Sequence, residues 1–246
     1  MQDMEIMILK ETPDYLVISK PIDISVHPGA GEPQETITDW LQKKYPQITK
    51  LPWKTTERIG IVHRLDKDTS GILLLAKNPE ALDFYQDQFR NRTTEKHYQT
   101  LVFGRPPFEH GSIDAFIRRD PKDREKQRVD YIDFELNDAE TKFSATEYKT
   151  IANYSYKKQP LTLLDVKLNT GRKHQIRVHL KYEGCPIIGD QKYFTKPSKR
   201  LSKELGATRQ FLHAISLRFD EYPSGKRIQV VNELPEDLNE ILKKIK

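Results

Sequence analysis

Two acidic side chains stand in a short polar run between two apolar segments of the chain. The run is His63-Arg64-Leu65-Asp66-Lys67-Asp68-Thr69-Ser70-Gly71, and residues 59–62 and 72–76 flank it. A carboxylate in a loop between two rigid strands has a fixed geometry, which a nucleophile or a charge-stabilising group needs. The alternative is structural, because Asp, Ser and Gly are also common in turns. On residue types alone, Asp66 and Asp68 fit either role.

A second polar cluster occupies residues 170–180, with the sequence TGRKHQIRVHL. The alternation of Ile176, Val178 and Leu180 fits a strand, whereas the spacing of Ile176 and Leu180 also fits a helix. We favour a helix, because turn residues stand just before it and Gly184 follows it closely. The N-terminus of such a helix, with basic residues beside it, would attract a carboxylate or a phosphate. The alternative is a basic surface helix. His174 and His179 are five residues apart, which is off the spacing of a helical metal pair.

The elements that must position these clusters follow from periodicity and from cap residues. Strands are expected at 15–20, 59–62, 72–76, 97–103, 143–148, 161–168, 211–219 and 227–231, and helices at 36–45, after Asn78-Pro79 and after Leu234-Pro235. Strands outnumber helices and do not alternate with them. This predicts an α+β fold, a mixed or antiparallel sheet flanked by helices and loops, in a single domain over residues 1–246.

Residues 118–128 carry six basic and three acidic residues and no apolar one. Such a segment cannot bury a face, so we expect an exposed, mobile excursion within a basic insertion at about residues 105–140. It is either a solvated surface loop or a flexible finger that grips phosphates and becomes ordered on binding.

Bulk composition narrows the class of protein. The 246 residues include 41 Lys and Arg against 36 Asp and Glu, a modest excess of positive charge that points only weakly to nucleic acid. The single cysteine, Cys185, excludes an internal disulfide and is expected to be a buried small apolar residue. No signal peptide and no apolar stretch of membrane-spanning length is visible, so a cytoplasmic setting is expected.

The polar run with its following strand, HRLDKDTSGILLLAK at 63–77, resembles the catalytic motif of the RluA family of pseudouridine synthases. The cluster at 170–180 is similar to a late motif of that family. Further similar segments stand in the family's order over roughly residues 12–220: Lys20-Pro21, Val26-His27-Pro28-Gly29, Lys96-His97-Tyr98, residues 186–190 and residues 211–214. The resemblance implies a catalytic domain without the small N-terminal RNA-binding domain that many members carry.

The resemblance also implies roles for individual residues. Asp66 matches the catalytic carboxylate, and Arg177 matches the arginine that pairs with it and keeps it ionised. Tyr98 matches the tyrosine that stacks on the target uracil. Arg64 matches the arginine associated with flipping the base out of its stack, and Leu180 matches an apolar residue of the base pocket.

The implied activity is isomerisation of a uridine in ribosomal or transfer RNA, which needs no redox cofactor, ATP or metal. We expect a monomer with RNA as its partner and no membrane association. Asp68 is expected to be structural, with a local side-chain bond to the backbone. Candidates for contact with RNA are His63, Arg118, Arg119, Lys122, Arg124, Arg172, Lys173, His174 and Lys192.

Two other classes remain open at this point. A non-catalytic RNA-binding module would use the same basic segments, although such a protein has no need of the set Asp66, Tyr98 and Arg177. A metal-dependent phosphohydrolase would use His63, Asp66 and Asp68, but no second cluster of His and Asp completes that site.

Overall fold

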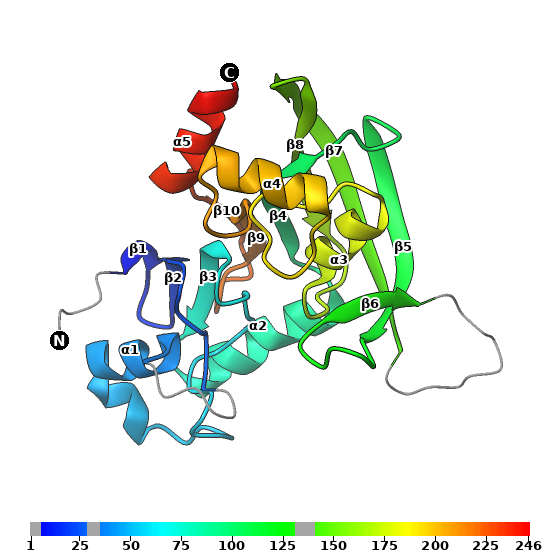
Figure 1. Ribbon diagram of the computed structural model, residues 1–246. Helices are drawn as coiled ribbons and strands as arrows, with labels where there is room; N and C mark the ends of the chain where they lie inside the picture. The colour runs from blue at the N-terminus through cyan, green and yellow to red at the C-terminus, as the bar shows by residue number, and fades with distance from the viewer. Residues whose placement is uncertain (1–5, 29–34, 131–140) are drawn as a thin grey trace. The chain divides into compact units, whose positions relative to one another are not determined.

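The computed structural model describes residues 6–28, 35–130 and 141–246 (Figure 1). These ranges contain ten strands, five α-helices and one short 3-10 helix. The chain divides into two compact units. Unit 1 comprises Met1–Glu95 and Ala214–Glu233, and unit 2 comprises Lys96–His213 and Leu234–Lys246. The predicted α+β class is confirmed. No helix of the described part is long and apolar enough to cross a membrane.

Unit 1 is built on a buried sheet. Its strands are β1 (Met7–Glu11), β2 (Tyr15–Lys20), β3 (Ser70–Ala76), β9 (Leu212–Asp220, from Ala214 onward) and β10 (Arg227–Val231). They follow the order β1-β2-β3-β9, with β10 paired to β9. Every residue of β3 is buried, so the strand is covered on both faces and reads as a continuous apolar run. Tyr15, Tyr85 and Phe219 pack edge to face in the core beside it.

The register of β2 on β3 fixes where the polar run ends and β3 continues. The two strands are antiparallel, with Tyr15 opposite Ala76 and Lys20 opposite Gly71. Gly71 has φ of 119°, and a Cβ at this position would collide with the backbone of Ala214. Only glycine fits there, because it has the conformational freedom and lacks the side chain.

Two helices of unit 1 begin as their cap residues predict. Thr36 and Asp39 form a capping box at the start of α1 (Ile37–Lys44), which the 3-10 helix η1 (Pro46–Lys50) follows. The Asn78 side chain accepts a hydrogen bond from the Ala81 N–H (2.8 Å) at the start of α2 (Pro79–Asn91). Both predicted helices are confirmed.

The strand expected at 59–62 is wrong. Residues 57–60 form a turn, and only Ile61 makes an isolated antiparallel bridge, to Leu75. Gly60 has φ of 71° and packs so closely against the Ala76 carbonyl that a Cβ would not fit. The apolar residues around it are buried by this close approach, which periodicity cannot distinguish from strand pairing.

Unit 2 contains an antiparallel sheet whose strands lie in the order β4-β8-β7-β5-β6. The strands are β4 (Glu95–Phe103), β5 (His110–Arg119), β6 (Gln127–Asp130), β7 (Lys142–Tyr156) and β8 (Gln159–Leu168). Its helices are α3 (Gln175–Tyr182), α4 (Lys196–Leu205) and α5 (Glu236–Ile245). The predicted last helix is confirmed. Cys185 is buried as expected, and burial raises the pKa of its thiol to about 11.

The basic segment 118–128 is not the mobile excursion that its composition predicts. It forms the antiparallel hairpin of β5 and β6, in which Arg118 lies opposite Arg128. Asp130 forms ion pairs with both arginines, and Asp123 pairs with Lys126. Internal charge pairing and the neighbouring strand β7 therefore order a segment that has no apolar face. Within the expected insertion at about 105–140, residues 131–140 lie outside the described residues.

Candidate active site

Asp66 lies at the first position of a tight turn that leads into β3. The N–H of Thr69 donates to the carbonyl oxygen of Asp66 (3.1 Å), which closes a four-residue turn. Leu65 and Thr69 on either side are buried, whereas the Asp66 side chain is half-buried. Asp68 makes no side-chain hydrogen bond among the described residues, so the local bond expected for it is absent and the backbone closes the turn instead.

A fully buried lysine, Lys20, stabilises this turn through hydrogen bonds to backbone carbonyl oxygens. The Nζ atom of Lys20, at the end of β2, donates to the carbonyl oxygens of Pro21 (2.7 Å), Ile24 (3.1 Å) and Lys67 (2.9 Å). A lysine without solvent access is stable only when its charge is compensated in this way. Since Lys67 follows Asp66 directly, Lys20 fixes the backbone that carries the carboxylate. The resemblance singled out Lys20-Pro21 but did not predict this contact.

Replacing Lys20 by Met is expected to destabilise the fold and to misplace Asp66. The methionine leaves one buried and two half-buried carbonyl oxygens without the Lys20 donor, at a cost of roughly 3 kcal/mol in free energy of unfolding. A carboxylate displaced by about 1 Å would lower kcat by about 10–100-fold. Urea unfolding and a turnover assay measure the two effects.

The control for this variant is Lys10→Met on the neighbouring strand β1. Lys10 pairs with Glu221 at the surface, with its side chain 35% exposed, so its loss should cost about 1 kcal/mol or less. Equal stability of the two variants would contradict the role given to Lys20.

The two residues before Leu65 have different environments. Arg64 is exposed, and its Nη1 atom donates to Nε2 of His27 (3.3 Å). His63 instead accepts the N–H of Leu74 at Nε2 (3.1 Å) and stacks on the Phe89 ring, with 4.4 Å between the ring centroids. The structure therefore gives His63 a structural task, and it leaves the Arg64 guanidinium at the surface, where it could reach a nucleic acid.

In unit 2, the start of α3 is fixed by a buried glutamine. Gln175 accepts hydrogen bonds from the Thr170 hydroxyl (2.8 Å) and the Arg172 N–H (2.9 Å). It donates to the carbonyl oxygen of Ala145 (3.0 Å) and the hydroxyl of Thr146 (2.8 Å) on β7. All the polar atoms of its side chain are thus satisfied, and the predicted helix is anchored to the sheet at its first residue.

Arg177, on the first turn of α3, is held by a carboxylate that the sequence did not reveal. Its Nε and Nη2 atoms donate to the two carboxylate oxygens of Asp190, at 2.7 and 2.9 Å. The side chains are only 5% and 0% exposed. Asp190 Oδ1 also accepts the N–H groups of Lys192 and Tyr193, and the Arg177 guanidinium lies 5.2 Å from the centroid of the Tyr193 ring. A bidentate buried pair of this kind fixes the plane of the guanidinium.

The other predicted site residues of unit 2 are buried. Tyr98 lies on β4 opposite Val166 of β8, with its side chain directed into the protein and 7% of the residue exposed. Leu180 on α3 is fully buried. Nδ1 of His97, next to Tyr98, lies within hydrogen-bond distance of the Asp165 carboxylate, at 3.0 Å. Strand pairing therefore fixes the position of Tyr98 along β4.

Several candidates for RNA contact have partners within the protein. Nδ1 of His174 lies 2.9 Å from the Tyr193 hydroxyl, and Nε of Arg172 donates to the carbonyl oxygen of Phe143 (3.1 Å). Lys192 Nζ lies 2.6 Å from Glu125. Lys173 is exposed.

The remaining candidates lie in the β5–β6 hairpin. Arg118 pairs with Asp130, and Nε of Arg119 donates to the Arg124 carbonyl oxygen (2.6 Å). Lys122 and Arg124 are exposed in the turn. Within the described ranges, no three His, Cys, Asp or Glu side chains gather in a way that could hold a metal ion.

Sequence comparison identifies the family. A sequence model described as RNA pseudouridylate synthase matches residues 14–182, which include the Asp66 turn, Tyr98 and Arg177. The chain belongs to this family. As an RNA pseudouridylate synthase it is an isomerase that acts on RNA, as the resemblance of its motifs implied.

Relatives and solved structures agree with this assignment. The chain is 40% identical over 92% of its length to an uncharacterised RNA pseudouridine synthase of Chloroflexus aurantiacus, and spans 65% of that protein. It is 34% identical to the ribosomal large subunit pseudouridine synthase D of Vibrio parahaemolyticus, covering 96% of this chain and 70% of the relative.

Among solved structures, the human RNA pseudouridylate synthase domain containing 4 matches with a TM-score of 0.74 and 27% identity, over 97% of this synthase and 92% of the human chain. The human RNA pseudouridylate synthase domain containing 1 matches with a TM-score of 0.72 and 24% identity, over 96% and 86% of the two chains. The second likeness supports the fold alone.

Proposed function

We propose that this chain isomerises a uridine of large-subunit ribosomal RNA, with Asp66 as its catalytic carboxylate. Several relatives carry the name ribosomal large subunit pseudouridine synthase D, which favours ribosomal over transfer RNA. The enzyme would act as a monomer in the cytoplasm. Asp66 belongs to unit 1, and Tyr98 and Arg177 belong to unit 2. Catalysis by these three residues would therefore need both units, which would form one catalytic domain.

The reaction rearranges one nucleotide without any external atom. The bond between N1 of uracil and C1′ of ribose breaks, the base turns, and a new bond joins C5 to C1′. The proton on C5 leaves, and N1 gains one. A carboxylate can support this reaction as a nucleophile or by stabilising positive charge that develops on the ribose. Both routes need Asp66 ionised and close to C1′.

The other residues divide the remaining tasks. Arg177 matches the family's arginine that pairs with the catalytic carboxylate, and it would supply the positive charge of that pair. Tyr98 would stack on the extruded uracil and assist removal of the C5 proton, and Leu180 would line the pocket around the base. Arg64, exposed beside the turn, would fill the space that the base leaves in the RNA.

The proposal rests on one observation: hydrogen bonds from Thr69 and Lys20 fix the backbone at Asp66 and at Lys67, the residue after it. A carboxylate that serves only as a turn former needs no buried lysine behind it, since the backbone already closes the turn. A fixed orientation is what catalysis requires of a reacting group, because misplacement by about 1 Å is costly.

The activity is tested with unmodified transcripts of large-subunit ribosomal RNA and of transfer RNAs. We expect pseudouridine at one or few positions of the ribosomal transcript, without any added cofactor. Because isomerisation leaves the mass unchanged, the product is measured by mass spectrometry of nuclease fragments after chemical labelling specific for pseudouridine. Product in transfer RNA alone would overturn the choice of substrate. Tight RNA binding without product in either RNA would overturn the proposed function and favour an RNA-binding module.

A further inference from the structure

The exposed face of α4 (Lys196–Leu205) carries more positively than negatively charged side chains. Lys196, Lys199, Arg200 and Lys203 follow helical spacing, so they share one face, and all four are exposed. The face extends over about 10 Å along the helix axis, which corresponds to about three phosphates of one nucleic acid strand. Glu204 is the one carboxylate among the exposed residues of this helix.

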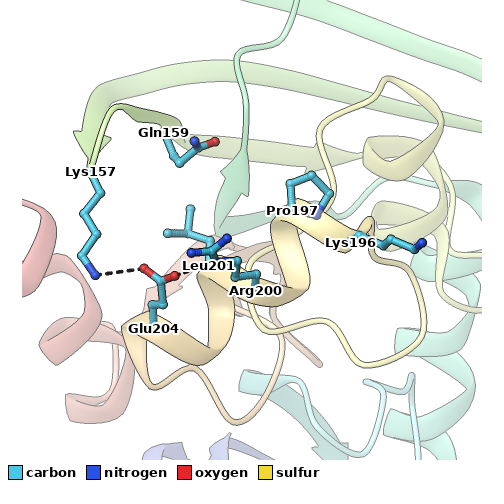
Figure 2. Close-up of a pocket in the computed structure, with 7 residues that line it drawn as sticks. All are labelled: Lys157, Gln159, Lys196, Pro197, Arg200, Leu201 and Glu204. Atoms are coloured by element: carbon cyan, nitrogen blue, oxygen red, sulfur yellow. Dashed lines mark hydrogen bonds and ion pairs between the residues drawn. The ribbon is translucent and has the colours of Figure 1, made fainter.

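The turn between β7 and β8 carries two more cations, of which Lys157 reaches this helix. Lys157 Nζ lies 3.0 Å from Glu204, and Arg200 Nε lies 3.1 Å from the other oxygen of the same carboxylate. Figure 2 shows Lys157 reaching from the turn toward α4. We call these six cations the α4 basic surface: Lys157, Lys158, Lys196, Lys199, Arg200 and Lys203.

A hollow of about 430 Å³ opens within this surface. Lys157, Gln159, Lys196 and Arg200 line it, and Leu201 contributes apolar surface (Figure 2). Glu204 forms ion pairs with both Lys157 and Arg200, which fixes the positions of these two side chains. Its single negative charge leaves the pair of cations with a net charge of one. Hydrogen bonds from these two cations lower the pKa of Glu204, which keeps the linking carboxylate ionised.

The charge of this surface differs from that of the β5–β6 hairpin, the segment expected from sequence to grip RNA. Asp120, Asp123, Glu125 and Asp130 stand among the six cations of the hairpin. In the α4 basic surface, by contrast, Lys158, Lys196, Lys199 and Lys203 form no ion pair with any carboxylate of the described residues. Their field is therefore available to an external anion.

The backbone conformation of the turn is unfavourable for the two lysines that occupy it. Lys157 and Lys158 form a two-residue hairpin turn with φ of 49° and 66°. Positive φ at both positions is the geometry of a type I′ turn, in which Asn-Gly is strongly favoured and a residue with a long side chain is strained. Residues that break a local rule of this kind are concentrated at functional sites.

We propose that the α4 basic surface binds the sugar–phosphate backbone of the substrate RNA at nucleotides other than the uridine that reacts. The inference rests on the proposed function for its choice of ligand. It assigns to this surface the affinity for the flanking RNA, whereas the motif residues act on the target nucleotide. Since the contacts are to phosphates, they do not depend on base sequence.

The first test is the variant Lys196→Gln/Lys199→Gln/Lys203→Gln. Filter binding to an unmodified large-subunit ribosomal RNA transcript is measured over a range of salt concentrations. Each lost phosphate contact lowers the slope of log affinity against log salt by about one, so the slope should fall by about two to three. The control, Lys50→Gln/Lys226→Gln/Lys246→Gln, removes the same charge at other exposed positions and should leave the slope near that of the wild type.

The second test separates a binding role from a structural one. The variant Lys157→Asn/Lys158→Gly places favoured residues in the turn and removes two cations. We expect a melting temperature higher by about 2–4 °C, because strain is relieved and a lost surface ion pair costs little. We also expect weaker RNA binding with a lower salt slope. Higher stability with unchanged binding would overturn the role of the turn lysines.

The outcomes distinguish this inference from the proposed function. At saturating RNA, both variants should keep the wild-type single-turnover rate, because neither alters the residues that act on the uridine. If the wild type forms no pseudouridine, the proposed function fails, yet the salt slopes still report on the surface. If the triple variant binds like its control, the inference is wrong whatever the activity.

Discussion

Asp66→Asn is expected to lower kcat for pseudouridine formation by about 10,000-fold or more. A carboxamide has no negative charge to stabilise a developing positive charge on ribose, and it is a far poorer nucleophile than a carboxylate. Its size is nearly that of Asp, and the turn is closed by backbone atoms, so the fold should be unchanged. Single-turnover assays with saturating ribosomal transcript, followed by pseudouridine-specific chemical labelling and mass spectrometry, measure the effect.

Asp68→Asn is the matched control in the same loop. Asp68 is also half-buried and makes no side-chain hydrogen bond among the described residues, so we expect activity within a few-fold of the wild type. Asp66→Asn should retain its affinity for RNA, because no phosphate contact is lost. Turnover by this variant at the wild-type rate would remove Asp66 from the mechanism.

The second large effect is expected from Asp190→Asn. This change replaces one carboxylate oxygen that accepts from Arg177 with an amide group and removes the negative charge of Asp190 from beside a buried guanidinium. Breaking a buried pair in this way costs about 3–5 kcal/mol in free energy of unfolding. Because the Arg177 plane is then no longer fixed, we also expect kcat to fall by about 10–100-fold. Urea unfolding monitored by circular dichroism and the turnover assay give the two values.

Asp237→Asn provides a control of the same geometry. Asp237 accepts two hydrogen bonds from Arg209, at 2.7 and 3.0 Å, but the Asp237 side chain is 46% exposed. Water can therefore replace part of what is lost, and the stability cost should be smaller. No change in kcat is expected. If Asp190→Asn lowered stability but left kcat intact, Asp190 would be a folding residue and not a positioning one.

Elements with local signals could be predicted from the sequence. The capping residues Thr36 and Asn78 determine where α1 and α2 begin, and the apolar periodicity of α5 determines which face is buried. By contrast, β5, β6 and α4 were missed. The hairpin gains its order from pairing with β7 and from ion pairs, and α4 has only two buried leucines to reveal it. Such stabilisation depends on tertiary partners that a local pattern does not contain.

The candidate site divides in the same way. Asp66, Tyr98 and Arg177 are proposed as site residues because their neighbours in sequence form recognisable motifs. The residues that hold them were not predicted, since Asp190 lies 13 positions from Arg177 and Lys20 lies 47 positions from Lys67. His63 was assigned to RNA, although its ring accepts a backbone hydrogen bond from β3. The type of a side chain determines which hydrogen bonds it can form, but the partner of each bond depends on the fold.

The pairing of Lys20 opposite Gly71 has a consequence for protein engineering. Successive side chains on a strand point to opposite faces, so a one-residue insertion in β2 would turn the ammonium group away from the loop it supports. A graft of this loop into another scaffold would accordingly have to transfer residues 15–24 together with residues 63–76. Chimaeras that cut between these segments and keep only the loop should express as folded but inert proteins.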